Sequence, residues 1–323
     1  MKPSEINFSI IIPVYNRPQE IDELLESLTK QNFSDRFEVL IIEDGSNQKS
    51  DLIAEKYKKQ LDLKYFFKEN SGAGESRNFG MQKATGNYFI ILDSDVIVPN
   101  QYLSVIKNTL ESNFTDAFGG PDAAHKNFSA LQKAINYSMT SFLTTGGIRG
   151  KKNGVGRFQL RSFNMGLSKK AFEVTQGFSA MKTGEDIDLT FRLWENSLET
   201  QLITQAFVYH KRRSSLKQFF KQTYSFGKAR PILNRKYPES AKITFWFPSL
   251  FILGWVLSLL LLYFDYHILF DLYFLYMFIL LSDSFLKNYL NPFIAWLSLI
   301  TSFTQFLGYG LGFLKSQFFT KKN

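Results

Sequence analysis

The stretch Tyr88-Phe89-Ile90-Ile91-Leu92-Asp93-Ser94-Asp95 decides how the rest of this sequence is interpreted. A run of apolar residues is typical of a strand that is buried on both faces, as in a parallel sheet covered by helices. The run stops at two carboxylates, and open α/β sheets bind ligands beyond the carboxyl ends of their strands. Two carboxylates there suit Mg²⁺ or Mn²⁺, which also bind phosphate oxygens. The alternative is an ordinary turn, since Asp and Ser are favoured in turns.

Strands and helices alternate on the amino side of this stretch. Apolar runs predict strands, and apolar residues at helical spacing predict the helices between them. We expect strands over 8–12, 37–42, 63–67 and 88–92, with helices from Pro18, over 50–60 and over 77–83. Such alternation predicts a mostly parallel, doubly wound α/β sheet with helices on both faces. Further along, we expect a helix from Gly184 and a strand over 206–210.

The composition points to a protein with an apolar environment beyond its core. The chain has 323 residues, a length that suggests about two domains. Aromatic residues make up 16% of it, with 34 Phe. The chain has no cysteine, which excludes disulfides and thiolate zinc sites.

Positive charge is concentrated in one region of the chain. The net charge is +9, and residues 211–242 carry ten Lys and Arg against one Glu. Within this region, Leu216, Phe219, Phe220 and Tyr224 lie at helical spacing among lysines, which predicts an amphipathic helix suited to a membrane surface. Nucleic acid is an alternative partner, but we expect none, because the apolar segments that follow favour an anionic membrane surface and the acids at the predicted site would repel phosphate without a metal.

Three apolar segments follow, over 245–264, 268–285 and 292–314. Each approaches the length that spans a bilayer, so we expect a multi-pass protein of the inner (cytoplasmic) membrane. The basic region before these segments predicts that the N-terminal part lies in the cytoplasm. Asp271 and Asp283 count against the second span. Three spans would also place Lys315, Lys321 and Lys322 outside, so two spans with an interfacial segment remain an alternative.

Five motifs, in this order, give the sequence a family resemblance. They are Ile11-Ile12-Pro13-Val14-Tyr15-Asn16-Arg17, Ile42-Glu43-Asp44-Gly45-Ser46, Arg77-Asn78-Phe79-Gly80, Asp93-Ser94-Asp95 and Gly184-Glu185-Asp186. The set resembles the inverting family 2 glycosyltransferases of GT-A fold, over roughly residues 7–235. The resemblance implies a GT-A catalytic domain at 1–235, followed by a membrane domain at 236–323.

The resemblance also implies roles on the donor side of the site. Pro13, Tyr15, Asn16, Asp44 and Glu43 would border the nucleotide, with Glu43 standing where Asp is common. The diphosphate would be bound by Arg77, whose guanidinium matches a phosphate pair. Ribose or a metal-bound water would contact Asp93, and Mn²⁺ or Mg²⁺ would be ligated by Asp95. Asp93 is also a candidate metal ligand. His210 falls where relatives carry a histidine near the phosphates, and its imidazole could ligate Mn²⁺; a polar cap at a strand end is the alternative.

On the acceptor side, the resemblance implies that Asp186 is the general base. An inverting displacement needs a carboxylate beneath the attacking hydroxyl, opposite the leaving diphosphate. Glu185 would orient the acceptor, and Asn164 and Met165 would line its site. The alternative is an acidic helix start, which the helix dipole favours. Asp188, two residues further on, is an acid that could be mistaken for the general base.

These features predict a membrane-anchored enzyme that transfers a single sugar from a nucleotide-diphosphate sugar, expected to be a UDP-sugar. The acceptor would be lipid-linked or a cell-surface glycan. One alternative is a non-catalytic membrane protein that binds nucleotide sugars. Another is a processive polysaccharide synthase, which is disfavoured because Ser225-Phe226 stands where processive relatives carry Arg-Trp.

Overall fold

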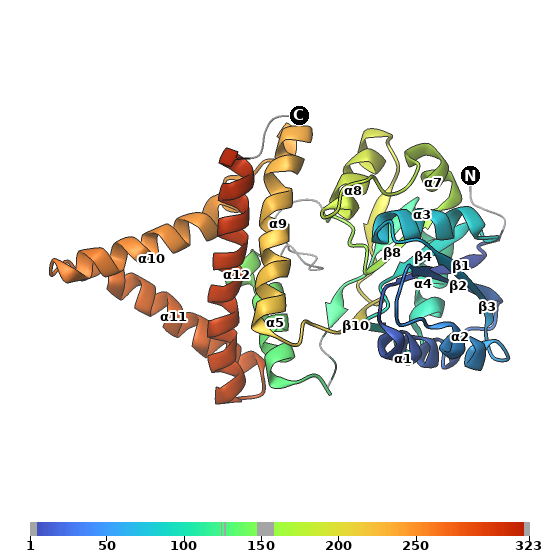
Figure 1. Cartoon of the computed structure of the whole chain (residues 1–323), viewed down its shortest axis with the longest axis horizontal. Coiled ribbons are helices and arrows are strands. Elements are labelled where there is room, and N and C mark those ends of the chain that lie inside the picture. The colour runs from blue at the N-terminus through green and yellow to red at the C-terminus, as the bar shows by residue number, and fades with distance from the viewer. Residues whose placement is uncertain (1–4, 124, 126, 147–157, 320–323) are drawn as a thin grey trace. The chain divides into compact units, whose positions relative to one another are not determined.

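The computed structural model describes residues 5–123, 125, 127–146 and 158–319. The chain forms two compact units (Figure 1). One consists of Met1–His125 with Ile148–Lys211, and the other of Lys126–Gly147 with Arg212–Asn323. The predicted division into a catalytic domain at 1–235 and a membrane domain at 236–323 stays a prediction.

The first unit contains all the strands of the described chain. They are β1 (Phe8–Val14), β2 (Phe37–Asp44), β3 (Asp62–Lys68), β4 (Tyr88–Leu92), β5 (Val96–Ile97), β6 (Ala117–Gly119), β7 (Asp122–Ala123), β8 (Asn164–Ser168), β9 (Thr200–Leu202) and β10 (Val208–His210). Its helices are α1 (Pro18–Thr29), α2 (Asp51–Tyr57), α3 (Ala73–Lys83), α4 (Tyr102–Ser112), α7 (Lys169–Thr175) and α8 (Glu185–Glu195).

Seven of the strands form the central sheet in the order β3-β2-β1-β4-β8-β6-β9. The pairs β1–β2, β2–β3, β1–β4 and β6–β9 are parallel, which confirms the mostly parallel α/β sheet. Strand β8 is the exception, because it runs antiparallel to both of its neighbours. A second sheet, in the order β5-β10-β7, was not predicted. Strand β10 lies within the strand expected over 206–210, whereas β5 and β7, of two residues each, are too short to give a sequence pattern.

Helices cover both faces of the central sheet, as the sequence predicts. Alternate residues of β4 point to opposite faces, with Tyr88, Ile90 and Leu92 in one core and Phe89 and Ile91 in the other. Apolar side chains of α1, α2 and α4 complete the first core. Those of α3, α7 and α8 complete the second. Since both faces are covered, ligands have access to the sheet at the ends of its strands.

The second unit is helical throughout its described residues. It contains α5 (Ala130–Thr140), α6 (Phe142–Thr145), α9 (Leu216–Lys236), α10 (Phe247–Tyr263), α11 (Ile268–Lys287) and α12 (Pro292–Phe319), with short 3-10 helices at Pro238–Ser240 and Ile243–Trp246. Three helices among the described residues are long and apolar enough to cross a membrane, namely Ile243–Tyr263, Ile268–Lys287 and Pro292–Phe319. This confirms the three predicted apolar segments. Lys321 and Lys322 lie outside the described residues.

Candidate active site

The smaller sheet brings together two regions that are far apart in the sequence. Asp93 and Asp95 follow the buried strand β4, and the short strand β5 begins directly after Asp95. Strand β10 pairs antiparallel with β5, and this register sets His210 opposite Val96. The backbone N–H of Lys211 donates to the Asp95 carbonyl at 2.9 Å and extends the pairing. His210 is thereby held beside the acidic pair.

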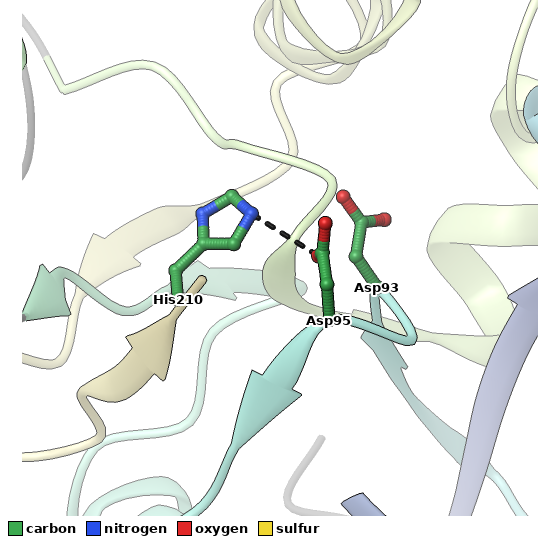
Figure 2. A group of neighbouring side chains, drawn as sticks. All are labelled: Asp93, Asp95 and His210. Carbon is green, nitrogen blue, oxygen red and sulfur yellow. Dashed lines mark ion pairs between the residues drawn. The ribbon is translucent and has the colours of Figure 1, made fainter. Parts of the chain in front are cut away.

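Asp93, Asp95 and His210 form a compact cluster of metal-ligating groups, with one ligand atom from each within 4.8 Å of the others. Figure 2 shows the two carboxylates side by side and the imidazole facing Asp95. The His210 Nε2 lies 3.2 Å from Asp95 Oδ1. Two carboxylate oxygens and an imidazole nitrogen form a donor set suited to Mn²⁺, and two hard oxygens also suit Mg²⁺. The residues present therefore fit the predicted metal.

Asp95 is also paired with Arg17, a residue just before α1 whose role the sequence does not predict. The Arg17 guanidinium forms an ion pair with Asp95 Oδ2. Burial alone would raise the pKa of the Asp95 carboxyl, but His210 and Arg17 outweigh it and hold that pKa well below its usual range. Asp95 is thus a carboxylate at neutral pH, as a metal ligand must be.

Two further residues lie next to the His210 ring. Phe163 stacks on it, with ring centroids 4.7 Å apart. Asp122, on β7, has its Oδ2 3.8 Å from His210 Nδ1, and its side chain is 2% exposed. A carboxylate behind the second nitrogen of a metal-binding histidine commonly orients the ring and selects its tautomer. Asp122 was not predicted, because its place next to His210 comes from the parallel β10–β7 pairing.

Arg77 joins the acidic pair to the start of α8. Its side chain is buried, with Nη2 2.7 Å from Asp93 Oδ1 and Nη1 3.2 Å from Glu185 Oε1. The guanidinium also lies over the Phe178 ring, 5.1 Å from its centroid. In this structure its single positive charge is therefore shared between two carboxylates. Its predicted contact with a diphosphate stays a prediction.

Glu185 and Asp186 occupy the first turn of α8, after Gly184 in the left-handed conformation at φ +85°. Asp186 Oδ2 lies 4.0 Å from Arg161 Nη1 and accepts a long hydrogen bond of 3.4 Å from the Ser162 N–H. Burial and the neighbouring Asp186 raise the pKa of the Glu185 carboxyl, although Arg77 opposes this. Asp186 Oδ1 accepts from the Ile187 N–H of its own helix at 2.8 Å, so Asp186 is held both by α8 and by residues outside it.

The predicted nucleotide-side acids lie at the end of β2, but their side chains bond to the protein. Asp44 accepts from the backbone N–H groups of Ser71 and Gly72, each at 2.9 Å, and pairs with Lys68. Burial opposes it, but Lys68 and these two N–H groups lower the pKa of the Asp44 carboxyl. Asp44 thus anchors the loop that leads into α3.

Glu43 is completely buried. Its carboxylate accepts from the Ser46 hydroxyl, from the Ser50 N–H at 2.8 Å and from the Tyr65 hydroxyl at 3.2 Å. These bonds hold the turn after β2, so Glu43 positions the loop. Its predicted direct contact with the donor stays a prediction, and the structure shows no exposed Glu43 oxygen for it.

The remaining predicted donor residues lie at the end of β1 and in the loop that leads to α1. Pro13 is buried within β1, while Tyr15 is exposed. Asn16 has φ +53°, and its side-chain oxygen accepts from the N–H groups of Asn47 and Gln48 at 2.8 and 3.0 Å. Asn16 thus ties this loop to the turn after β2, and Tyr15 presents an exposed aromatic ring at the same end of the sheet.

Three other residues are structural in this fold. Asn164 and Met165 are fully buried in β8, so neither offers a surface to an acceptor, contrary to the prediction. The Asn164 amide oxygen accepts from the Tyr102 hydroxyl at 2.6 Å, and its nitrogen donates to the Ala206 carbonyl at 2.8 Å. Asp188 is also fully buried and pairs with Arg192 at 3.0 Å, so it has a structural role in α8.

Comparison with known proteins identifies the family and the fold of the chain. The sequence profile described as Glycosyl transferase family 2 matches residues 9–174, just over half of the chain. The chain is similar to the poly(ribitol-phosphate) beta-N-acetylglucosaminyltransferase TarS of Staphylococcus aureus (strain Mu50), with 34% identity over 114 residues. That match covers 34% of this chain and 20% of TarS, so the chain matches about a fifth of that relative's length.

Two solved structures have the same fold. The crystal structure of S. aureus TarS 1–349 in complex with UDP-GlcNAc has a TM-score of 0.51 at 22% identity, with 69% of this chain and 66% of that chain covered. The mannosyltransferase PcManGT of Pyrobaculum calidifontis, in complex with GDP-Man and Mn²⁺, has a TM-score of 0.64 at 14% identity. Its comparison covers 99% of this chain and 89% of that chain.

Proposed function

Because the chain belongs to glycosyl transferase family 2, we propose that it is a membrane-anchored, metal-dependent inverting glycosyltransferase. It moves a single sugar from a nucleotide-diphosphate sugar to a lipid-linked or cell-surface glycan acceptor. The observation that carries this proposal is the arrangement around Arg77. One guanidinium nitrogen contacts a cluster suited to a divalent ion, and the other contacts the acidic start of α8.

On the donor side, Asp93, Asp95 and His210 would hold the ion, and Asp122 would orient the imidazole. A divalent ion there supplies a Lewis acid that stabilises charge on the diphosphate leaving group. Arg17 is partly exposed beside Asp95, so its guanidinium can turn to a phosphate oxygen. Tyr15 offers a ring against which a nucleobase can stack.

On the acceptor side, Asp186 takes the proton from the attacking hydroxyl. The new bond forms between that oxygen and the anomeric carbon while the bond from this carbon to the diphosphate oxygen breaks on the opposite face, so the configuration inverts. The proton ends on Asp186 and the electron pair leaves with the nucleoside diphosphate. Contacts with Arg161 and with the Ser162 N–H fix the orientation of the Asp186 carboxylate towards the acceptor hydroxyl.

The finer assignments rest on different observations. A UDP-sugar donor is favoured by the similarity to TarS, whose structure holds UDP-GlcNAc, while the structure of PcManGT holds GDP-Man. Anchoring in the inner (cytoplasmic) membrane, with the catalytic unit in the cytoplasm, is favoured by the apolar helices that follow a basic segment. Single addition is favoured by Ser225-Phe226 in α9.

The test is donor hydrolysis by the full-length protein in detergent, over a panel that includes UDP-GlcNAc, UDP-glucose and GDP-mannose. Each donor is incubated with Mn²⁺, Mg²⁺ or a chelator, because many transferases slowly pass the sugar to water. We expect chelator-sensitive release of the nucleoside diphosphate from one donor, and none from Asp95→Ala. A protein that binds nucleotide but transfers no sugar, either to water or to an acceptor in membrane extracts, would support the non-catalytic alternative instead.

A further inference from the structure

We propose that α10 and α11 are the segments that cross the membrane, as a hairpin, and that α12 lies along the membrane surface beside α9. This inference rests on the proposed membrane association and specifies its geometry. By length and composition alone, α12 is a third candidate span. Its packing inside the second unit argues against that assignment.

The three apolar helices differ in how much of their surface the protein covers. Within an apolar stretch of 18 residues in each helix, the protein buries 50% of α12, compared with 22% of the segment containing α10 and 11% of α11. Buried residues of α12 extend from Ile294 near its start to Ser316 near its end. A covered helix has less surface to offer to lipid, whereas α10 and α11 expose large apolar side chains along their lengths.

Helix α9 covers the carboxyl-terminal part of α12 in very close contact. A Cβ atom at Gly312 would lie 2.1 Å from the Tyr224 carbonyl oxygen, and one at Gly227 would lie 2.1 Å from the Tyr309 carbonyl oxygen. Arg235 Nη1 also donates to the Ser316 carbonyl at 3.3 Å. These contacts join the two backbones side by side (Figure 1), so wherever this part of α12 lies, α9 lies with it.

The charge of α9 excludes it from the hydrocarbon. Five exposed side chains carry positive charge along its length, namely Lys217, Lys221, Lys228, Arg235 and Lys236. If α12 crossed the bilayer, α9 would be drawn in beside it with several of these charges, and each is costly to bury in lipid. Along the surface, the same side chains can reach the anionic headgroups while the exposed apolar side chains of α12, Phe293, Trp296, Leu307 and Leu311, enter the interface.

The amino-terminal part of α12 also has a polar neighbour. Its Thr301 and Ser302 hydroxyls lie 2.5 and 3.2 Å from the Ser138 hydroxyl on α5, and Thr301 donates to the Ala134 carbonyl at 3.1 Å. Helix α5 has only 11 residues and is not among the helices apolar enough to span. Both parts of α12 are therefore packed against helices that belong in the interface.

Helices α10 and α11 are arranged as a membrane hairpin. They project away from α12 and meet at their far ends (Figure 1), with Phe264 to His267 as the connection. With the 3-10 turn before it, the first arm has 21 residues and the second has 20, and each is long enough to span the roughly 30 Å hydrocarbon core. In this topology both arms return to one side, so the C-terminal end of α12 lies on the same side as the segment before α9.

The chain has no cysteine, so single-cysteine labelling can test this topology directly. Three exposed positions report on it: Ser214→Cys before α9, Tyr266→Cys at the tip of the hairpin, and Gln317→Cys near the end of α12. Each full-length variant is treated with a membrane-impermeant maleimide in intact and in lysed cells. Total labelling in detergent confirms that each thiol is reactive.

We expect Gln317→Cys to label under the same condition as Ser214→Cys, and Tyr266→Cys under the opposite one. Labelling of Gln317→Cys together with Tyr266→Cys would mean that α12 crosses, and would overturn the proposal. Extraction with alkaline carbonate separates this failure from that of anchoring. Release by carbonate would show that the protein is not anchored, and would overturn the topology as well. Transferase activity is measured separately, and an active enzyme would keep the proposed reaction even if the anchoring or the topology is wrong.

Discussion

Asp95 is the residue at which opposite charges meet in the candidate site. Arg17 and His210 both contact its carboxylate, and Arg77 neutralises the adjacent Asp93. A divalent ion that binds this cluster would therefore compete with the Arg17 guanidinium for the negative charge of Asp95. This competition gives Arg17 a measurable effect that differs from that of a ligand.

We expect Arg17→Gln to bind Mn²⁺ more tightly than the parent protein when no nucleotide is present. Removing a competing, partly exposed ion pair is worth about 1 kcal/mol, or roughly a fivefold lower Kd. The measurement is a Mn²⁺ titration of the full-length protein in detergent. Arg36→Gln, at an exposed position away from the cluster, is the matched control and should leave the Kd unchanged. Weaker binding by Arg17→Gln would show that Arg17 supports the metal site rather than competing for it.

We expect Asp186→Asn to lose transfer by roughly 10²- to 10⁴-fold in kcat, the range typical of a general base. Donor binding should change little, because the variant keeps the size of the side chain and its contact with the Ser162 N–H. Turnover and nucleotide-sugar binding are measured on the same preparation. Glu195→Gln, at the exposed end of the same helix, should retain activity. Nearly full turnover in Asp186→Asn would remove the base assignment.

At the scale of elements, Glu38 joins the strands at the end of the sheet where β2 begins. Its carboxylate accepts from Ser9 on β1 at 2.6 Å, from Lys64 on β3 at 2.7 Å and from the Gly86 N–H before β4 at 3.2 Å. Burial alone would raise the pKa of the Glu38 carboxyl, but hydrogen bonds from Lys64, Ser9 and Thr85 lower it to about 2.

A carboxyl whose pKa is lowered on folding stabilises the protein above its ordinary pKa and loses that contribution as pH falls. We expect Glu38→Gln to cost about 3 kcal/mol of stability at pH 7, because folding lowers the pKa of this carboxyl from its ordinary value of 4.5 to about 2. The deficit should shrink as pH falls from 4.5 towards 2. Unfolding midpoints of the full chain between pH 3 and pH 7 measure it, with the exposed Glu69→Gln as control. A deficit independent of pH would contradict this role.

The α9–α12 pair depends on glycine at its closest contact. In Gly312→Val, the new side chain would meet the backbone of α9, so the helices must separate. Overpacking of this kind costs about 1–3 kcal/mol. We expect a lower Tm in detergent, while Leu311→Val, at an exposed position of the same helix, should have little effect. Equal Tm values for the two variants would mean that the helices do not pack this closely.

At the scale of the whole molecule, the sequence predicts the elements with long patterns and misses those set by pairing alone. Tyr88 to Leu92 predicts a buried strand because consecutive apolar residues face two cores. The antiparallel direction of β8 and the small sheet of β5, β10 and β7 leave no such pattern. The proximity of His210 to Asp95 follows from that small sheet, so family resemblance can suggest it, whereas no local pattern in the sequence predicts it.

The same difference applies to the site. Acidic residues after strands or at a helix start could be predicted, because their positions follow from the strand and helix boundaries. Which of them face a ligand could not. Glu43 and Asp44 look like donor-binding acids in sequence, yet both are buried, and each carboxylate bonds to the turn or loop that it stabilises. Asp122 and Arg161 were missed because nothing in their local sequence indicates the tertiary contacts that they make.

The most direct test of the central claim is Mn²⁺ binding to the full-length protein, followed by electron paramagnetic resonance with and without UDP. If Asp93, Asp95 and His210 form the metal centre of a sugar-nucleotide transferase, the protein binds Mn²⁺ saturably, UDP tightens the binding, and Asp95→Ala abolishes both effects. A Mn²⁺ titration of Asp95→Ala that matches the parent protein, with and without UDP, would contradict the account.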